Sequence, residues 1–152
     1  MKFFGSAWLL CVVLTASAAA ADPVAEAKQL FATFVQRLNA FDPAVADLYA
    51  DEAKIENTRR YPDGSKQTAV VPAPKYKAIL RDAMPAARQR GDTSDFLAVE
   101  YTPVGAKVRI STTRFSNAKL EATPLVLVVG PGPGGTWTIL EELSESRPER
   151  KE

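Results

Sequence analysis

Apolar residues near the N-terminus of the chain follow two different patterns. Residues 3–14 are almost continuously apolar, whereas the apolar residues from Val24 to Asn39 recur at steps of three and four. The second pattern predicts an amphipathic helix. Asp22 is a suitable N-cap for this helix, and Pro23 fits its first position.

The pattern beyond this helix predicts two more helices and a series of strands. A short helix is expected from Pro43, and a longer one from Pro72 that ends at Pro85. Between these helices, two strands are expected at 53–57 and 65–71. Four further strands, separated by turn residues, are expected at 95–101, 107–115, 125–129 and 137–143. The unbroken apolar run at 125–129 indicates a strand covered on both faces.

Helices followed by consecutive strands are typical of an α+β domain. We expect one domain over residues 22–144, in which a bent antiparallel sheet carries helices on its concave face and encloses a pocket. Residues 145–152 are charged and lack a pattern, which predicts a flexible tail. The core is expected to contain Phe31, Leu38, Ile79, Val108, Leu127 and Trp137.

The first apolar run is typical of an export signal. It follows Lys2, is too short to span a bilayer as a helix, and leads into a series of alanines that ends at Ala21. This order predicts a signal peptide over residues 1–21, cleaved after Ala21 or alternatively after Ala18 or Ala20. We therefore expect an exported protein, periplasmic or extracellular. A buried N-terminal helix is the alternative interpretation.

Composition limits the chemistry that the exported part can perform. The chain has no histidine, and its single cysteine, Cys11, lies inside the predicted signal peptide. Zinc, haem and iron–sulfur sites are therefore not expected, and we predict no cofactor and no metal. Lys2 is the only charged residue before Asp22, so the mature chain is formally neutral, which argues against nucleic acid as a partner. The sequence after the predicted signal peptide has no second long apolar run, so we predict no membrane segment after signal removal.

Two stretches of the sequence resemble the nuclear transport factor two-like superfamily, which includes ketosteroid isomerase, scytalone dehydratase and the SnoaL-like polyketide cyclases. They are Phe34–Pro43 and Leu48–Ile55, and the closing Trp137–Leu140 also fits. The resemblance covers residues 24–144. It implies a cone-shaped fold, with a strongly bent antiparallel sheet and N-terminal helices on its concave face.

The resemblance also implies where a pocket would lie. Phe34 occupies the position of the isomerases' tyrosine donor, and Asn57 that of their aspartate base, so the groups for proton transfer are missing. We expect Phe34, Asn57, Tyr101 and Ile139 to line a mostly apolar pocket that suits a small apolar or aromatic ligand. The favoured hypothesis is an exported small-molecule-binding or interaction protein without enzymatic activity, with a homodimer through the sheet as a further expectation.

The alternative is an isomerase or lyase with a rearranged site. Glu56 would be its base, and Tyr101 or Tyr49 its hydrogen-bond donor. Strand alternation offers a discriminating feature: if Ile55 faces the core, Glu56 points to the opposite face and Asn57 points inward. The adjacent Glu141 and Glu142 must likewise face opposite sides, and we interpret this acidic run, with nearby Glu145, as a solvated edge.

Overall fold

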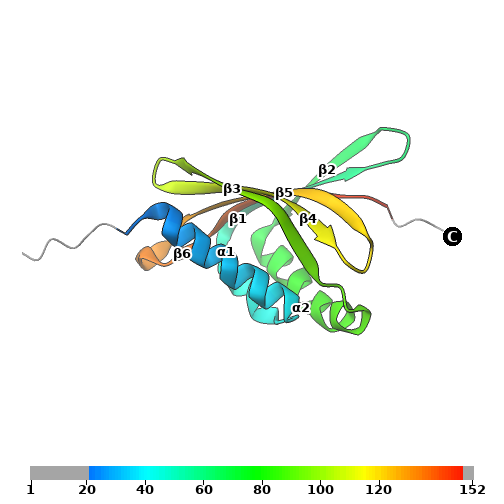
Figure 1. Ribbon diagram of the computed structural model, residues 1–152, viewed down its shortest axis with the longest axis horizontal. Helices are drawn as coiled ribbons and strands as arrows, with labels where there is room; N and C mark the ends of the chain where they lie inside the picture. The colour runs from blue at the N-terminus through cyan, green and yellow to red at the C-terminus, as the bar shows by residue number, and fades with distance from the viewer. Residues whose placement is uncertain (1–20, 149–152) are drawn as a thin grey trace, which may run out of the picture.

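The computed structural model of the chain describes residues 21–148 (Figure 1). The predicted signal peptide, apart from Ala21, and the last four residues of the predicted tail lie outside this range. In chain order, the elements are α1 (Pro23–Asn39), η1 (Pro43–Leu48), β1 (Tyr49–Arg60), β2 (Lys66–Pro72), α2 (Ala73–Arg90), β3 (Ser94–Val104), β4 (Lys107–Ser116), β5 (Glu121–Pro131), η2 (Pro133–Gly135) and β6 (Trp137–Ser146).

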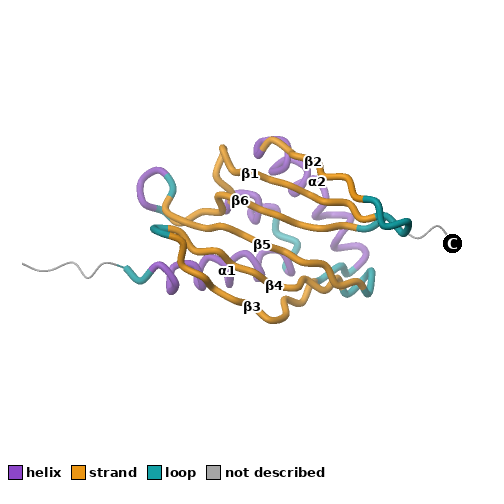
Figure 2. Tube along the Cα trace, turned by 90° about the horizontal axis from the view of Figure 1, so that it is seen from above, coloured by secondary structure: helices purple, strands orange, loops and turns teal. Residues whose placement is uncertain are grey.

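The six strands form one strongly curved sheet with both long helices on the same side (Figure 1). The strand order is β2-β1-β6-β5-β4-β3, so β2 and β3 form the two edges (Figure 2). The α+β class and the cone shape are confirmed, but the sheet is mixed, because β1 and β6 are parallel. The prediction of a purely antiparallel sheet was wrong. The alternation of residues in a strand is the same whether its neighbour is parallel or antiparallel, so the sequence pattern does not distinguish the two.

Local sequence signals set the beginnings of the N-terminal helices as expected. The Asp22 side chain accepts a hydrogen bond from Val24 N at 3.0 Å, and the Asp42 side chain accepts one from Ala44 N at 2.9 Å. The expected end of α2 at Pro85 is wrong, because the helix continues to Arg90. Pro85 is exposed, so water can solvate the carbonyl group that proline leaves without a partner.

The core lies between α1 and the concave face of the sheet. Among the predicted core residues, Phe31, Val108 and Leu127 are buried, and Leu38 and Trp137 are partly buried against them. Ile79 is 48% exposed, which contradicts the prediction. The inward face of α2 consists of residues spaced by three or four, namely Ala73, Tyr76, Leu80 and Met84. Ile79 lies outside this face.

Strands β5 and β6 differ from their predicted forms. Leu125, Leu127 and Val129 are buried, but Val126 and Val128 between them are partly exposed, so only one face of β5 is covered. Both long helices lie on the concave side, so no helix in the described part of the chain forms a second layer on the outer face (Figure 1). Strand β6 continues to Ser146, two residues into the predicted tail.

Candidate functional site

The concave face of the sheet changes from apolar to polar along its strands. Paired residues form successive rows across the sheet: Val108, Val129 and Ile139; then Ile110, Leu127, Glu142 and Ile55; then Thr112, Leu125, Ser144 and Asn57. Arg114 and Thr123 continue this sequence. A cavity of about 280 Å³ opens over the polar rows, between the sheet and Tyr76 of α2.

A buried carboxylate lies in the lining of this cavity. Glu142 is only 5% exposed, and the Tyr76 hydroxyl donates a 2.7 Å hydrogen bond to its Oε1 atom. The Tyr49 hydroxyl donates to Oε2. Burial, and after it the charge of Glu142, raise the pKa of both tyrosines well above the ordinary value. Both tyrosines therefore stay protonated near neutral pH and hold the carboxylate as donors.

Three elements distant in sequence place these groups. Tyr49 begins β1, Tyr76 lies on the inner side of α2, and Glu142 is in β6. The two rings pack edge to face, with centroids 5.5 Å apart. Lys77 joins α2 to β1, since its Nζ donates to Tyr49 O at 3.1 Å and to an Asp51 oxygen at 2.7 Å.

The polar side chains beside Glu142 are partly used within the protein. Asn57 Nδ2 donates to Ser144 Oγ at 3.1 Å, and Ser146 Oγ donates to Asn57 Oδ1 at 2.8 Å. Both ends of the Asn57 amide are therefore engaged. Arg114 Nε donates to Ser94 Oγ at 2.9 Å, and Arg114 has no ion pair among residues 21–148. Its other guanidinium nitrogens remain as donors beside the cavity.

The four residues expected to form a pocket do not meet in this cavity, because only Asn57 lines it. Phe34 and Ile139 are buried in the core. The Tyr101 ring packs against Phe31, with centroids 6.3 Å apart. The reason is the position of α1, whose phenylalanines fill the space above the apolar rows. The expected apolar lining also differs from the charged and hydroxyl side chains that surround this cavity.

Glu56 does not reach the cavity either. Ile55 is buried, Asn57 lines the cavity, and Glu56 pairs with Lys54 at 2.9 Å, so the predicted alternation is confirmed. Glu56 therefore cannot act as a base in this cavity. The interpretation of the acidic run as a solvated edge is wrong for Glu142.

A β-bulge explains why sequence reasoning missed Glu142. Ile139 pairs with Val129 and Glu141 pairs with Val128, so Leu140 is an extra residue in β6. Strict alternation from Ile139 would turn Glu141 inward, but the extra residue turns Glu142 inward instead. The two adjacent glutamates indicated that one of them faces inward, but their adjacency did not indicate which one is buried.

Solved structures share this fold. A nuclear transport factor 2-like protein of unknown function from Shewanella oneidensis has a TM-score of 0.59 at 13% identity, over 82% of this chain and 100% of that chain. A protein of unknown function from Pectobacterium atrosepticum has a TM-score of 0.59 at 19% identity, over 83% and 91%. A nuclear transport factor 2-like protein with a cystatin-like fold from Novosphingobium aromaticivorans has a TM-score of 0.54 at 13% identity, over 81% and 80%.

Neither known family models nor curated proteins match the sequence. The structural similarity establishes the nuclear transport factor two-like fold that the resemblance implied, and function has to be argued from the site. Within residues 21–148, no group of three or more potential ligands could hold a metal ion. No helix in the same range is long and apolar enough to cross a membrane.

Proposed function

We propose that this chain is an exported small-molecule-binding protein that holds its ligand against Glu142 in the concave cavity. The observation that carries the proposal is a buried carboxylate in the wall of a cavity, held by hydrogen bonds from two tyrosines. A buried charge is costly unless its acceptor sites are satisfied. The tyrosines use two of about four such sites, which leaves capacity for a donor on a ligand.

The lining favours a polar ligand over the apolar or aromatic one expected from sequence. Its hydroxyl, amine or amide N–H group would donate to Glu142, and Arg114 offers donors to an acceptor on the same ligand. Binding without catalysis is favoured because both tyrosine protons are directed at Glu142 and both ends of the Asn57 amide are engaged. None of these groups is directed at a ligand to transfer a proton.

Native mass spectrometry of the exported protein tests this function. We expect a bound small molecule that is released on denaturation, and we expect the Glu142→Gln variant to lose it. Glu141→Gln is the matched control, because it removes the same charge from the adjacent residue on the opposite face. Wild-type protein without a bound molecule would contradict the function, and equal retention in both variants would contradict the role of Glu142.

The second candidate function is an isomerase or lyase, and here Glu142 replaces Glu56. The specific observation is a carboxylate in the cavity wall that accepts hydrogen bonds from two phenols, of which Tyr76 lines the cavity and Tyr49 is buried behind it. In that case, turnover would be lost in Glu142→Gln and retained in Glu56→Gln. Turnover assays of the two variants, together with a pH–rate profile of the wild type on a candidate substrate, separate this function from simple binding.

We also propose a homodimer through the outer face of the sheet. Val126 and Val128 are partly exposed there, and no helix of residues 21–148 covers this face (Figure 1). A second copy would cover these valines and remove apolar surface from water. The same native mass spectra report the oligomer, and a monomer at micromolar concentration would contradict the proposal.

A further inference from the structure

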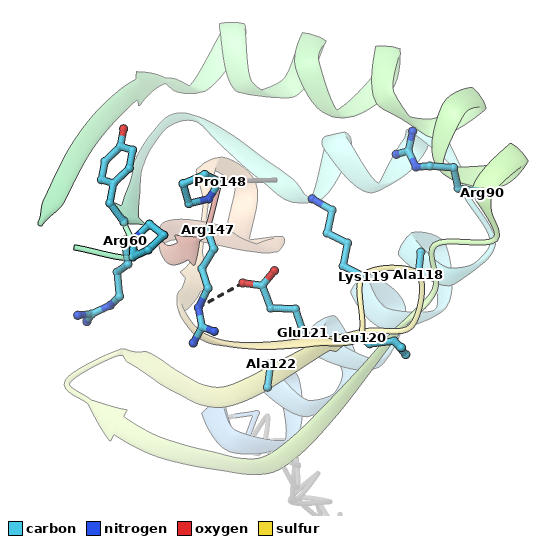
Figure 3. Close-up of a pocket in the computed structure, with 11 residues that line it drawn as sticks. Arg60, Arg90, Ala118, Lys119, Leu120, Glu121, Ala122, Arg147 and Pro148 are labelled. Atoms are coloured by element: carbon cyan, nitrogen blue, oxygen red, sulfur yellow. Dashed lines mark ion pairs between the residues drawn. The ribbon is translucent and has the colours of Figure 1, made fainter. Parts of the chain in front are cut away.

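A second, larger cavity of about 1160 Å³, which we call the wide opening, lies where β1 ends (Figure 3). Four separate segments converge on it: the end of β1, the end of α2, the turn between β4 and β5, and the residues after β6. Each contributes one basic side chain, namely Arg60, Arg90, Lys119 and Arg147. Figure 3 shows the Lys119 side chain extending into the opening.

Carboxylates compensate only part of this positive charge. Arg60 pairs with Glu145, and Arg147 Nε lies 3.4 Å from Glu121 Oε1, an oxygen without a hydrogen-bond partner. Arg90 and Lys119 have no ion pair within the part of the chain that the structure describes. The whole chain has a formal charge of only +1, so this concentration of cations does not follow from composition. Like charges gathered at one opening repel each other, and an anion would relieve that repulsion.

Hydrogen bonds hold the two unpaired cations in a common frame. Arg90 ends α2, and Thr93 follows shortly after it. Asn117 N donates to Thr93 O at 2.9 Å, and Asn117 Nδ2 donates to Thr93 Oγ1 at 3.1 Å. Lys119 N donates to Ser116 Oγ at 3.2 Å. These hydrogen bonds hold the turn that carries Lys119 against the connection that follows Arg90. Both cations therefore line the same opening.

The wide opening adjoins the cavity at Glu142. Lys119, Glu121 and Arg147 line both of them. A ligand that enters through the opening would pass these side chains before it reaches Glu142. The inner cavity offers an acceptor at Glu142, whereas the opening offers cations. The two ends of a bound molecule would therefore meet opposite charges.

We infer that Arg90 and Lys119 form an anion-binding subsite, and that the ligand is a small organic anion with a hydrogen-bond donor at its other end. A carboxylate or a phosphate would lie at the opening, and a hydroxyl or amine would reach Glu142. The inference rests on the proposed function only for the second end of the ligand. The anion subsite itself is separate and can be tested without the complete ligand.

The test is an NMR titration of the protein without its signal peptide, using inorganic phosphate and, separately, acetate as probes. Chloride keeps the ionic strength constant. We expect saturable shifts of the amide signals around Lys119, and about tenfold weaker binding in the Arg90→Gln/Lys119→Gln variant. Tighter binding of phosphate indicates a phosphate group on the ligand, tighter binding of acetate indicates a carboxylate, and either result supports the subsite.

The matched control is Lys75→Gln/Arg109→Gln, which removes two exposed cations that line neither cavity. This variant should bind the probes as the wild type does. Equal weakening in both double variants, or no saturable shift in the wild type, would overturn the inference. Probe binding at Lys119 without a bound molecule in the native mass spectra would retain the subsite and reject the proposed function. A bound molecule in the native mass spectra, without probe binding at Lys119, would reject the subsite and retain the proposed function.

Discussion

The two halves of the concave face use the same fold in opposite ways. Under α1, Phe31, Phe34, Phe96 and Tyr101 pack with ring centroids 5.5–6.3 Å apart and fill the space above the sheet. Under α2, the sheet presents Glu142, with hydroxyl and charged side chains that surround a cavity. In this chain, α1 therefore contributes mainly to packing, whereas α2 contributes to the site.

The difference also explains why positions taken from the isomerases were misleading. Phe34 was expected at a pocket because it occupies a donor position in those enzymes. In this chain, Phe34 packs against Phe31 and Phe96, so the position belongs to the core. The candidate site lies further along the strands, where Tyr76 of α2 meets Glu142. A shared fold therefore does not fix which part of its concave face remains open.

The largest effect is expected in the packed half. Leu127→Ala should lower the free energy of unfolding by about 2–5 kcal/mol, because it removes buried methyl groups and leaves a cavity. Urea titration measures this change. Leu120→Ala is the control, since the same change in a side chain that is 76% exposed, in the turn before β5, should cost much less. A loss below about 1 kcal/mol for Leu127→Ala would show that β5 is not central to the core.

A smaller effect is expected in the polar half. Tyr76→Phe removes one donor from the buried Glu142 carboxylate, which should cost about 1.5–3 kcal/mol, the range for hydrogen bonds to charged groups. Tyr61→Phe is the control, because the Tyr61 hydroxyl donates to Gln67 in an exposed pair. Urea titrations of the two variants should differ clearly. Equal stability would mean that Tyr76 does not support the carboxylate.

The same tyrosines predict a dependence of stability on pH. Burial and the charge of Glu142 raise their pKa in the folded protein, whereas an unfolded tyrosine titrates near pH 10, at about its ordinary value. The folded state therefore keeps protons that the unfolded chain loses. Stability that is fully present below about pH 10 should fall as the pH rises further, by up to about 1.4 kcal/mol per pH unit for each tyrosine. Urea midpoints measured from about pH 9 to pH 11 check this slope.

The control for the pH dependence is the Tyr76→Phe variant. With one of the two tyrosines removed, its stability should fall less steeply above about pH 10. An identical slope in the variant and the wild type would show that other groups cause the loss. Tyr101 of the packed half also has a pKa raised by burial, but this group is present in both proteins, so the difference between their slopes reports Tyr76 in the polar half.

Local patterns predicted the elements better than the site. The alternation of Val108, Ile110 and Thr112 placed their common face correctly, since the three residues are buried together. Asp22 and Asp42 also act as the expected caps. These features depend on neighbours within a few residues, so a sequence reading can find them.

The site depends on contacts that local patterns do not report. Tyr76 and Glu142 are 66 residues apart, and Tyr49 and Glu142 are 93 apart. The direction of Glu142 is set by an extra residue in β6, and periodicity cannot reveal such an insertion. The exposure of Ile79 likewise depends on how α2 is rotated against the sheet. The predictions for Glu142 and Ile79 therefore failed because both depend on long-range packing.

The extra residue in β6 has a consequence for the tolerance of the site to error. If the strand paired without its bulge, Glu141 would lie opposite Leu127 and would point inward in place of Glu142. A shift of one residue in the pairing of β6 with β5 would therefore replace the Glu142 carboxylate with that of Glu141. The row opposite Leu127 would keep an inward carboxylate. Insertions and deletions in the preceding turn therefore put less at risk here than at a site with a single acidic residue.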